Sequence, residues 1–313
     1  MNRARDLLLG AAGAAGTGLA WRGLRGHVAQ ARASRHQRPV DTGDPGAQDT
    51  TWTHRWERIN HAGAEVTLLE GVALVAGTSG TALVTAGVWG SRSASARALP
   101  FALVSLGAGA LGALDDLRQD TDRKGLAGHL RALASGRVTT GAVKIIGLGA
   151  TGLAAVLWQD RQGESGPAGP ARAWSTLAGA AVVAGAANLA NLFDLRPGRA
   201  LKVGALTAGP LVLTGPGSPG AAITLGAIAS VLPDDLAGRS MLGDTGANPL
   251  GAMLGLALVA RQGVAARTVS LGVITGLTLA SERISFTRVI EASPVLRELD
   301  ALGRRGRPGA HRE

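Results

Sequence analysis

Nine apolar runs, each bounded by charged residues or by Gly and Pro, constrain this chain more than any other feature. They lie at about 7–21, 66–89, 99–114, 142–158, 174–193, 201–214, 220–233, 248–260 and 268–281. Hydrophobic residues make up 46% of the chain and charged residues only 17%. Such runs favour helices that cross a bilayer, where a helix satisfies every backbone hydrogen bond internally. We therefore predict an all-α, polytopic integral membrane protein with about nine transmembrane helices.

Some of these runs are shorter than the ~20 residues that a span ideally needs. Runs 201–214 and 220–233 are joined by a turn rich in Gly and Pro. They fit either two tilted spans or a re-entrant hairpin. The run 7–21 also fits a secretory signal peptide, but no small-residue cleavage site precedes a soluble domain, so we interpret it as a helix that is retained.

Small residues are frequent within the runs, as at 107–112 and 179–185. In membrane proteins such residues let helix backbones approach closely, so we expect close helix packing there. A phosphate-binding loop is excluded because no Gly-x-x-x-x-Gly-Lys-Ser/Thr pattern occurs.

The basic residues between the runs are distributed unevenly. With the N-terminus outside, 24 of the 32 Lys and Arg residues fall on one side of the membrane. The positive-inside rule makes that side cytoplasmic. The expected organisation is a first transmembrane helix at 1–21, a cytoplasmic and partly disordered loop at 22–65, a multi-span membrane domain at 66–283 and a basic cytoplasmic tail at 284–313.

Composition also excludes several kinds of site. The chain has no Cys, which excludes disulfides and thiolate metal sites, and its six His residues show no zinc spacing. The net charge of +10 is not accompanied by basic runs interleaved with aromatic residues, so we expect no nucleic-acid partner. Carboxylate and carbonyl oxygens remain as metal ligands, and they favour a Mg²⁺-type ion.

Two adjacent acids, Asp115 and Asp116, end the apolar run at 99–114. Charged side chains are costly within the hydrocarbon core, so this pair is expected at the interface, neutralised by a cation. Lys124, which follows shortly, could bind a phosphate beside the two carboxylates. The alternative is a solvated helix end with a salt-bridged loop.

A second polar cluster contains Asn188, Asn191 and Asp194 at the end of the run 174–193. Their spacing of three residues puts them on nearly one stripe of a helix. Amides and an acid on one stripe suit a nucleotide or a metal, whereas the alternative is hydrogen bonding between helices.

A third cluster contains Asp234, Asp235 and the sequence Gly243-Asp244-Thr245-Gly246. The glycines let the backbone approach a ligand closely, with Asp244 displayed between them. In the alternative, Asp244 or Asn248 caps the following helix. A further acid, Glu70, lies at the start of the run 66–89, where it is either functional or favourable to the helix dipole.

The order of these motifs resembles that of the polyprenyl-phosphate N-acetylhexosamine-1-phosphate transferases, a family that includes phospho-N-acetylmuramoyl-pentapeptide transferase and the GlcNAc-1-phosphate transferases. The resemblance runs from about Asn60 to Arg283. It is carried by Asp115-Asp116 with Lys124-Gly125-Leu126, by Asn191-Leu192-Phe193-Asp194, and by Gly243-Asp244-Thr245-Gly246 with Leu250-Gly251.

The resemblance implies transfer of a sugar 1-phosphate from a UDP-sugar to a polyprenyl phosphate such as undecaprenyl phosphate, with release of UMP. It implies that Asp115 and Asp116 lie at the lipid-phosphate site, with Asp115 as a base, and that Asp244 binds Mg²⁺. Asn188, Asn191, Asp194, Asp234 and Lys124 are then expected to bind substrate. The expected setting is the bacterial inner membrane, with cytoplasmic active-site loops, in peptidoglycan or other envelope glycan synthesis; a homodimer is left open.

The sequence departs from the family pattern at three places. Pro197 stands where the family has a second acid, Asp234 replaces an asparagine, and residues 282–305 lack the histidine cluster of the last cytoplasmic loop. These departures leave open a catalytically silent relative that acts as a scaffold or lipid-binding partner. Asp115-Asp116-x-x-x-Asp120 also leaves open an intramembrane prenyltransferase, although a second motif of that kind is not evident.

Overall fold

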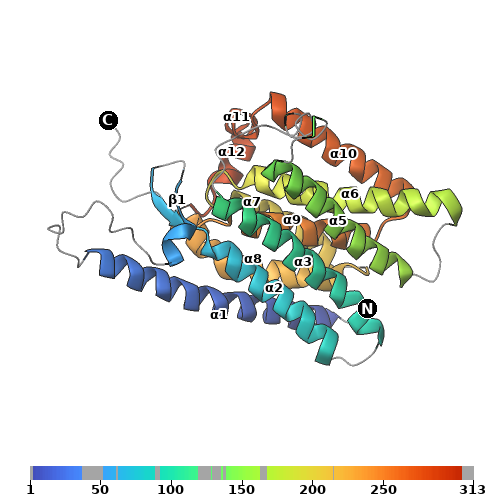
Figure 1. The fold of residues 1–313 in the computed structure, drawn as a ribbon, viewed down its shortest axis with the longest axis horizontal. Helices are drawn as coiled ribbons and strands as arrows, with labels where there is room; N and C mark the ends of the chain where they lie inside the picture. Colours follow the sequence, from blue (N-terminus) through green and yellow to red (C-terminus); the bar gives the residue numbers. More distant parts are fainter. Residues whose placement is uncertain are drawn as a thin grey trace.

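The computed structural model describes residues 3–36, 52–60, 63–88, 92–118, 128, 135–136, 139–162, 168–213 and 215–304. Over these residues the chain is almost entirely helical (Figure 1). Its α-helices are α1 (Arg3–His36), α2 (Leu69–Val88), α3 (Arg92–Arg118), α5 (Thr140–Arg161), α6 (Gly169–Phe193), α7 (Arg199–Leu213), α8 (Ser218–Leu236), α9 (Gly243–Val259), α10 (Val264–Arg283), α11 (Phe286–Ala292) and α12 (Pro294–Ala301). The prediction of an all-α membrane protein is therefore confirmed for its helical class, over the described residues.

Helix α9 forms the centre of the bundle, and nearly all of its residues are buried. It packs against α2, α3, α5, α6, α7 and α8. Its sequence is rich in Gly and Ala, and a Cβ at Gly251 would lie 2.6 Å from the carbonyl carbon of Ala186 in α6. A Cβ at Gly112 of α3 would lie 2.6 Å from the backbone nitrogen of Thr245, in the first turn of α9. The predicted close packing through small residues is therefore confirmed, since only glycine allows these backbones to approach.

Among the helices of the described residues, five are long and apolar enough to cross a membrane, and they support a membrane-embedded protein. These segments are Leu69–Gly87, Arg97–Arg118, Thr140–Arg161, Gly169–Phe193 and Val264–Arg283. The expected nine spans are not confirmed, because α1, α7, α8 and α9 are not among the five. Helices α7 and α9, with 15 and 17 residues, are shorter than the ~20 residues of a typical span.

The segment before α2 differs from the expected loop. Residues 22–36 continue α1 without a break. The part of the expected loop that was predicted to be disordered, 39–51, lies outside the described residues. A 3₁₀ turn (Trp52–Trp56) then leads into a two-stranded antiparallel sheet of β1 (Glu57–Ile59) and β2 (Glu65–Thr67). Arg32 and Arg35 of α1 form ion pairs with Glu57 of β1. The long helix therefore holds this hairpin at one end of the bundle.

The tail beyond α10 folds back onto α7 rather than extending away. Arg199 of α7 donates to both carboxylate oxygens of Asp300 in α12, at 2.7 and 2.9 Å. Burial by itself would raise the pKa of Asp300, but hydrogen bonds from Arg199 and Arg304 outweigh it and lower the pKa to about 2. The expected basic tail thus contains two short helices, of which α12 is anchored by an ion pair; residues 305–313 lie outside the described residues.

Acidification from about pH 4 to pH 2 should weaken the attachment of α12 to α7. Because the folded-state pKa of Asp300 is depressed from its ordinary 3.8, its stabilising contribution is fully present above that value and is lost as the pH falls through about 2. Hydrogen-exchange protection factors of 294–301 should fall over this range. In Asp300→Asn they should already be low at pH 5 and change little below it, whereas constant protection in the unsubstituted protein would contradict the prediction.

Candidate functional site

Asp116, near the end of α3, caps the N-terminus of α9. Its carboxylate accepts hydrogen bonds from the backbone N–H groups of Asp244 (3.2 Å) and Thr245 (2.8 Å), and from the Thr245 hydroxyl (2.6 Å). The first N–H groups of a helix lack partners within the helix, and a negative charge there also interacts well with the helix dipole. The acid at position 116 thus joins two motifs that are 128 residues apart in the sequence.

Lys144, from a third helix, α5, lies between the carboxylates of Asp115 and Asp244. The Lys144 ammonium, near the start of α5, forms an ion pair with Asp244 and lies 3.6 Å from Asp115. Only 13% of the Lys144 side chain is exposed, so this charge is largely withdrawn from water. Asp115 and Asp244 therefore share one cation, while Asp116 holds the start of the helix that carries Asp244. We call Asp115, Asp116, Asp244 and Lys144 the acid–lysine cluster.

Asp194, one residue beyond α6, holds the other side of the turn that begins α9. Its carboxylate accepts from the Gly243 N–H at 2.9 Å. Gly243 has φ +59°, and a Cβ there would lie 2.9 Å from an Asp116 oxygen, so both conformation and space require glycine. Burial, and then the neighbouring Asp235, raise the pKa of Asp194 well above its ordinary value. The two acids together fix the backbone on either side of Asp244.

Two further acids are buried close to Asp194. Asp235 of α8 accepts from the Gly198 N–H at 2.7 Å, and Glu70 of α2 accepts from the Ser240 hydroxyl. Ser240 in turn forms a parallel bridge with Thr67 of β2. Glu70 is therefore part of the contact that fixes the loop between α8 and α9, which favours a positioning role over the helix-dipole alternative.

Asn188 and Asn191 lie on the last turns of α6, which extends through Phe193 as the spacing predicted. Both are half-buried, and within the described residues neither side chain makes a hydrogen bond. Asp194 ends the same helix and is directed at Gly243. The structure thus brings the Asn188–Asp194 stripe to the end of the bundle that holds the acid–lysine cluster, with two amides free to accept a ligand.

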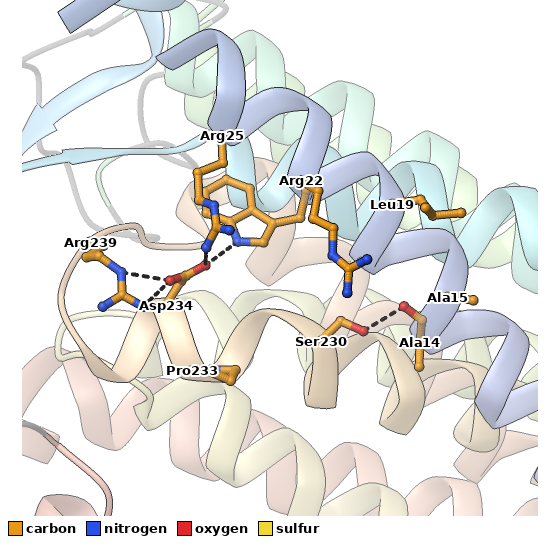
Figure 2. Close-up of a pocket in the computed structure, with 11 residues that line it drawn as sticks. Ala14, Ala15, Leu19, Arg22, Arg25, Ser230, Pro233, Asp234 and Arg239 are labelled. Carbon is orange, nitrogen blue, oxygen red and sulfur yellow. Dashed lines mark hydrogen bonds and ion pairs between the residues drawn. The ribbon is translucent and has the colours of Figure 1, made fainter. Parts of the chain in front are cut away.

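Asp234 lies apart from the other candidate residues. Its carboxylate faces α1, where it accepts from Trp21 Nε1 (2.6 Å) and Arg25 (2.9 Å), and it also pairs with Arg239 (Figure 2). Its neighbour Asp235 points instead toward Gly198. The adjacent acids Asp234 and Asp235 of the third cluster therefore lie in two different surroundings, one against α1 and the other against Gly198. Lys124 lies outside the described residues.

Sequence reasoning missed Lys144, Thr245 and the capping role of Asp116. A signal for Lys144 was present, since it is a lone basic residue at the start of an apolar run. Nothing local, however, relates it to Asp244, which lies 100 residues away. The pairing results from the packing of α5 beside α3 and α9.

The acid–lysine cluster has the donor chemistry that Mg²⁺ requires. Within the described ranges, no three acidic or histidine side chains already surround a common metal position. Mg²⁺ is commonly held by one or two carboxylates together with substrate phosphates, and Asp115 and Asp244 are two such hard oxygen donors beside one another. The residues therefore fit a metal that binds together with a phosphorylated substrate.

Comparison with known proteins yields neither a matching family model nor a matching curated protein.

Proposed function

We propose that this protein transfers a sugar 1-phosphate from a UDP-sugar to a polyprenyl phosphate and releases UMP. The observation that supports this most is the acid–lysine cluster, in which carboxylates from α3 and α9 meet a cation from α5 beside long apolar helices. A reaction between a lipid phosphate and a nucleotide sugar needs such a site at a membrane surface. The order of motifs in the sequence agrees with the same chemistry.

In the proposed reaction an oxygen of the polyprenyl phosphate attacks the phosphorus that bears the sugar. The bond from this phosphorus to the bridging oxygen breaks, and UMP leaves with the electron pair. Asp115 would accept the proton of a monoanionic acceptor phosphate, and Lys144 would offset the charge that the two substrates bring together. Phosphoryl transfer depends mostly on positioning and charge stabilisation, which fixed side chains supply.

Mg²⁺, held by Asp115 and Asp244, would neutralise charge on the diphosphate when bound. Asp116 and Asp194 would keep Asp244 in place through their bonds to the start of α9. Asn188 and Asn191 would face the nucleotide. We further propose nine spans, cytoplasmic active-site loops and a role in bacterial envelope glycan synthesis, as the sequence motifs and charge distribution imply.

The proposal is tested with purified protein in detergent micelles, undecaprenyl phosphate and a panel of UDP-sugars. We expect UMP release with at least one donor, dependent on both the lipid phosphate and Mg²⁺. Reactions without the lipid phosphate, or with excess EDTA, serve as controls. Absence of UMP release across UDP-GlcNAc, UDP-GalNAc, UDP-glucose and UDP-MurNAc-pentapeptide would contradict the proposal.

A silent relative that acts as a scaffold is the second candidate function, and one observation favours it. The carboxylate expected to bind the metal, Asp244, is already paired with Lys144, while Asp116 caps a helix. Both acids could therefore serve the fold alone. In that case Asp115→Asn and Asp244→Asn would leave the cellular phenotype unchanged, whereas deletion of the gene would not.

A further inference from the structure

A cavity of about 530 Å³ lies between α1 and α8, outside the acid–lysine cluster (Figure 2). Its wall along α1 changes from apolar to charged over about three helical turns. Ala14, Ala15, Gly18 and Leu19 form an apolar half, whereas Arg22 and Arg25 form a charged half. The cavity therefore suits a ligand with one charged end and one apolar end.

The charged half carries an excess of positive charge. Three guanidinium groups, those of Arg22, Arg25 and Arg239, line it together with a single carboxylate, that of Asp234. Asp234 holds Arg25 and Arg239 in place, yet each of these side chains remains 55% exposed. Both side chains are therefore partly exposed where they line the cavity.

Arg22 is the most informative residue of the cavity. Among the described parts of the chain it has no hydrogen-bond or ion-pair partner, although Arg25 and Arg239 nearby are both paired. In Figure 2 its guanidinium extends from α1 toward Ser230 of α8, into the space between the two helices. This exposed guanidinium faces the cavity without a counter-ion among the described residues, so it is available to bind an anion.

We propose that this cavity is a binding site for a phosphate group, with Arg22, Arg25 and Arg239 as its ligands. Guanidinium groups match the geometry of phosphate oxygens and form charge-assisted hydrogen bonds with them. The apolar half favours a phospholipid, whose acyl chain would lie along Leu19; this residue is 67% exposed. A free phosphate compound would use the charged half only. The site does not depend on the proposed transferase activity, since Asp115, Asp116 and Asp244 do not line it.

Binding is measured by native mass spectrometry of the full chain in detergent micelles. Three ligands are compared: dioleoyl-phosphatidylglycerol, dioleoylglycerol, which lacks the phosphate, and inorganic phosphate. We expect Arg22→Gln to weaken binding of the phosphate-bearing ligand about tenfold, the loss typical of one charge-assisted hydrogen bond. Arg3→Gln is the matched control, since it removes the same charge from an exposed position at the N-terminal end of α1, away from the cavity.

A second pair of variants separates the two sources of phosphate. Gly18→Leu places a side chain in the apolar half, next to Ser230, whereas a side chain at Gly23 meets nothing within 4 Å. If the ligand is a phospholipid, Gly18→Leu weakens phosphatidylglycerol binding and Gly23→Leu does not. If the ligand is a free phosphate, inorganic phosphate binds to both variants equally well.

Two results would overturn the proposal. One is equal binding of dioleoylglycerol and phosphatidylglycerol, which would show that the phosphate is not recognised. The other is unchanged binding in Arg22→Gln when its melting temperature matches that of the unsubstituted protein. Because Arg22 is exposed and unpaired within the described residues, this substitution is expected to leave the fold intact.

Discussion

Asp244→Asn should reduce UMP release about a thousandfold, an effect typical of losing one charged or preorganised group at a phosphoryl- or acyl-transfer site. The substitution keeps the shape of the side chain but removes the charge that pairs with Lys144 and is proposed to hold Mg²⁺. Lys144 keeps Asp115 as a partner, so the fold should survive. The measurement is the initial rate of UMP release, with membrane extraction and melting temperature as checks of folding.

Asp160→Asn is the matched control for this prediction. Asp160 forms an ion pair with the buried Arg267 near the opposite end of α5, and its loss also removes one carboxylate from a partly buried pair. Breaking that pair should lower the melting temperature but leave most of the UMP release per folded molecule. Equal loss of turnover in both variants would argue against a special role for Asp244, and full activity in Asp244→Asn would favour the scaffold alternative.

Gly112→Ala should destabilise the protein by about 2 kcal/mol and also reduce turnover strongly. The added Cβ would overlap the backbone carbonyl of Asp244 and lie 2.6 Å from the Thr245 nitrogen, so α3 and α9 must separate. Separation would break the hydrogen bonds through which Asp116 caps α9. Displacement of catalytic groups by roughly 1 Å can reduce a rate by about a hundredfold.

Gly149→Ala in α5 provides the comparison, because a Cβ there meets nothing within 4 Å. Alanine is the better helix former by about 1 kcal/mol, so this control should leave stability unchanged or slightly increased. For both variants, the melting temperature in detergent micelles measures the change in stability, and the rate of UMP release measures the change in turnover. Similar stability of Gly112→Ala and Gly149→Ala would show that the α3–α9 contact tolerates an extra methyl group.

Much of the architecture was predictable because hydropathy and helix periodicity are local properties. The apolar runs correspond to helices, and Asn188 and Asn191 lie on the last turns of α6, with Asp194 one residue beyond its end. The number of spans was not predictable in the same way. Helix α9 is apolar, but its 17 residues are nearly all buried by protein and it is not among the five candidate spans, and apolarity alone does not separate a protein core from a bilayer.

The adjacent acids Asp234 and Asp235 show most clearly what the sequence by itself determined. It determined that two carboxylates end a helix, and that consecutive side chains on a helix point about 100° apart. Only the tertiary structure decided that Asp234 meets Trp21 and Arg25 of α1, whereas Asp235 meets the Gly198 N–H. The same holds for Lys144 and Asp244, since their pairing arises from the contact of separate helices. A local sequence pattern sets which face a charge occupies, but helix packing sets what that face touches.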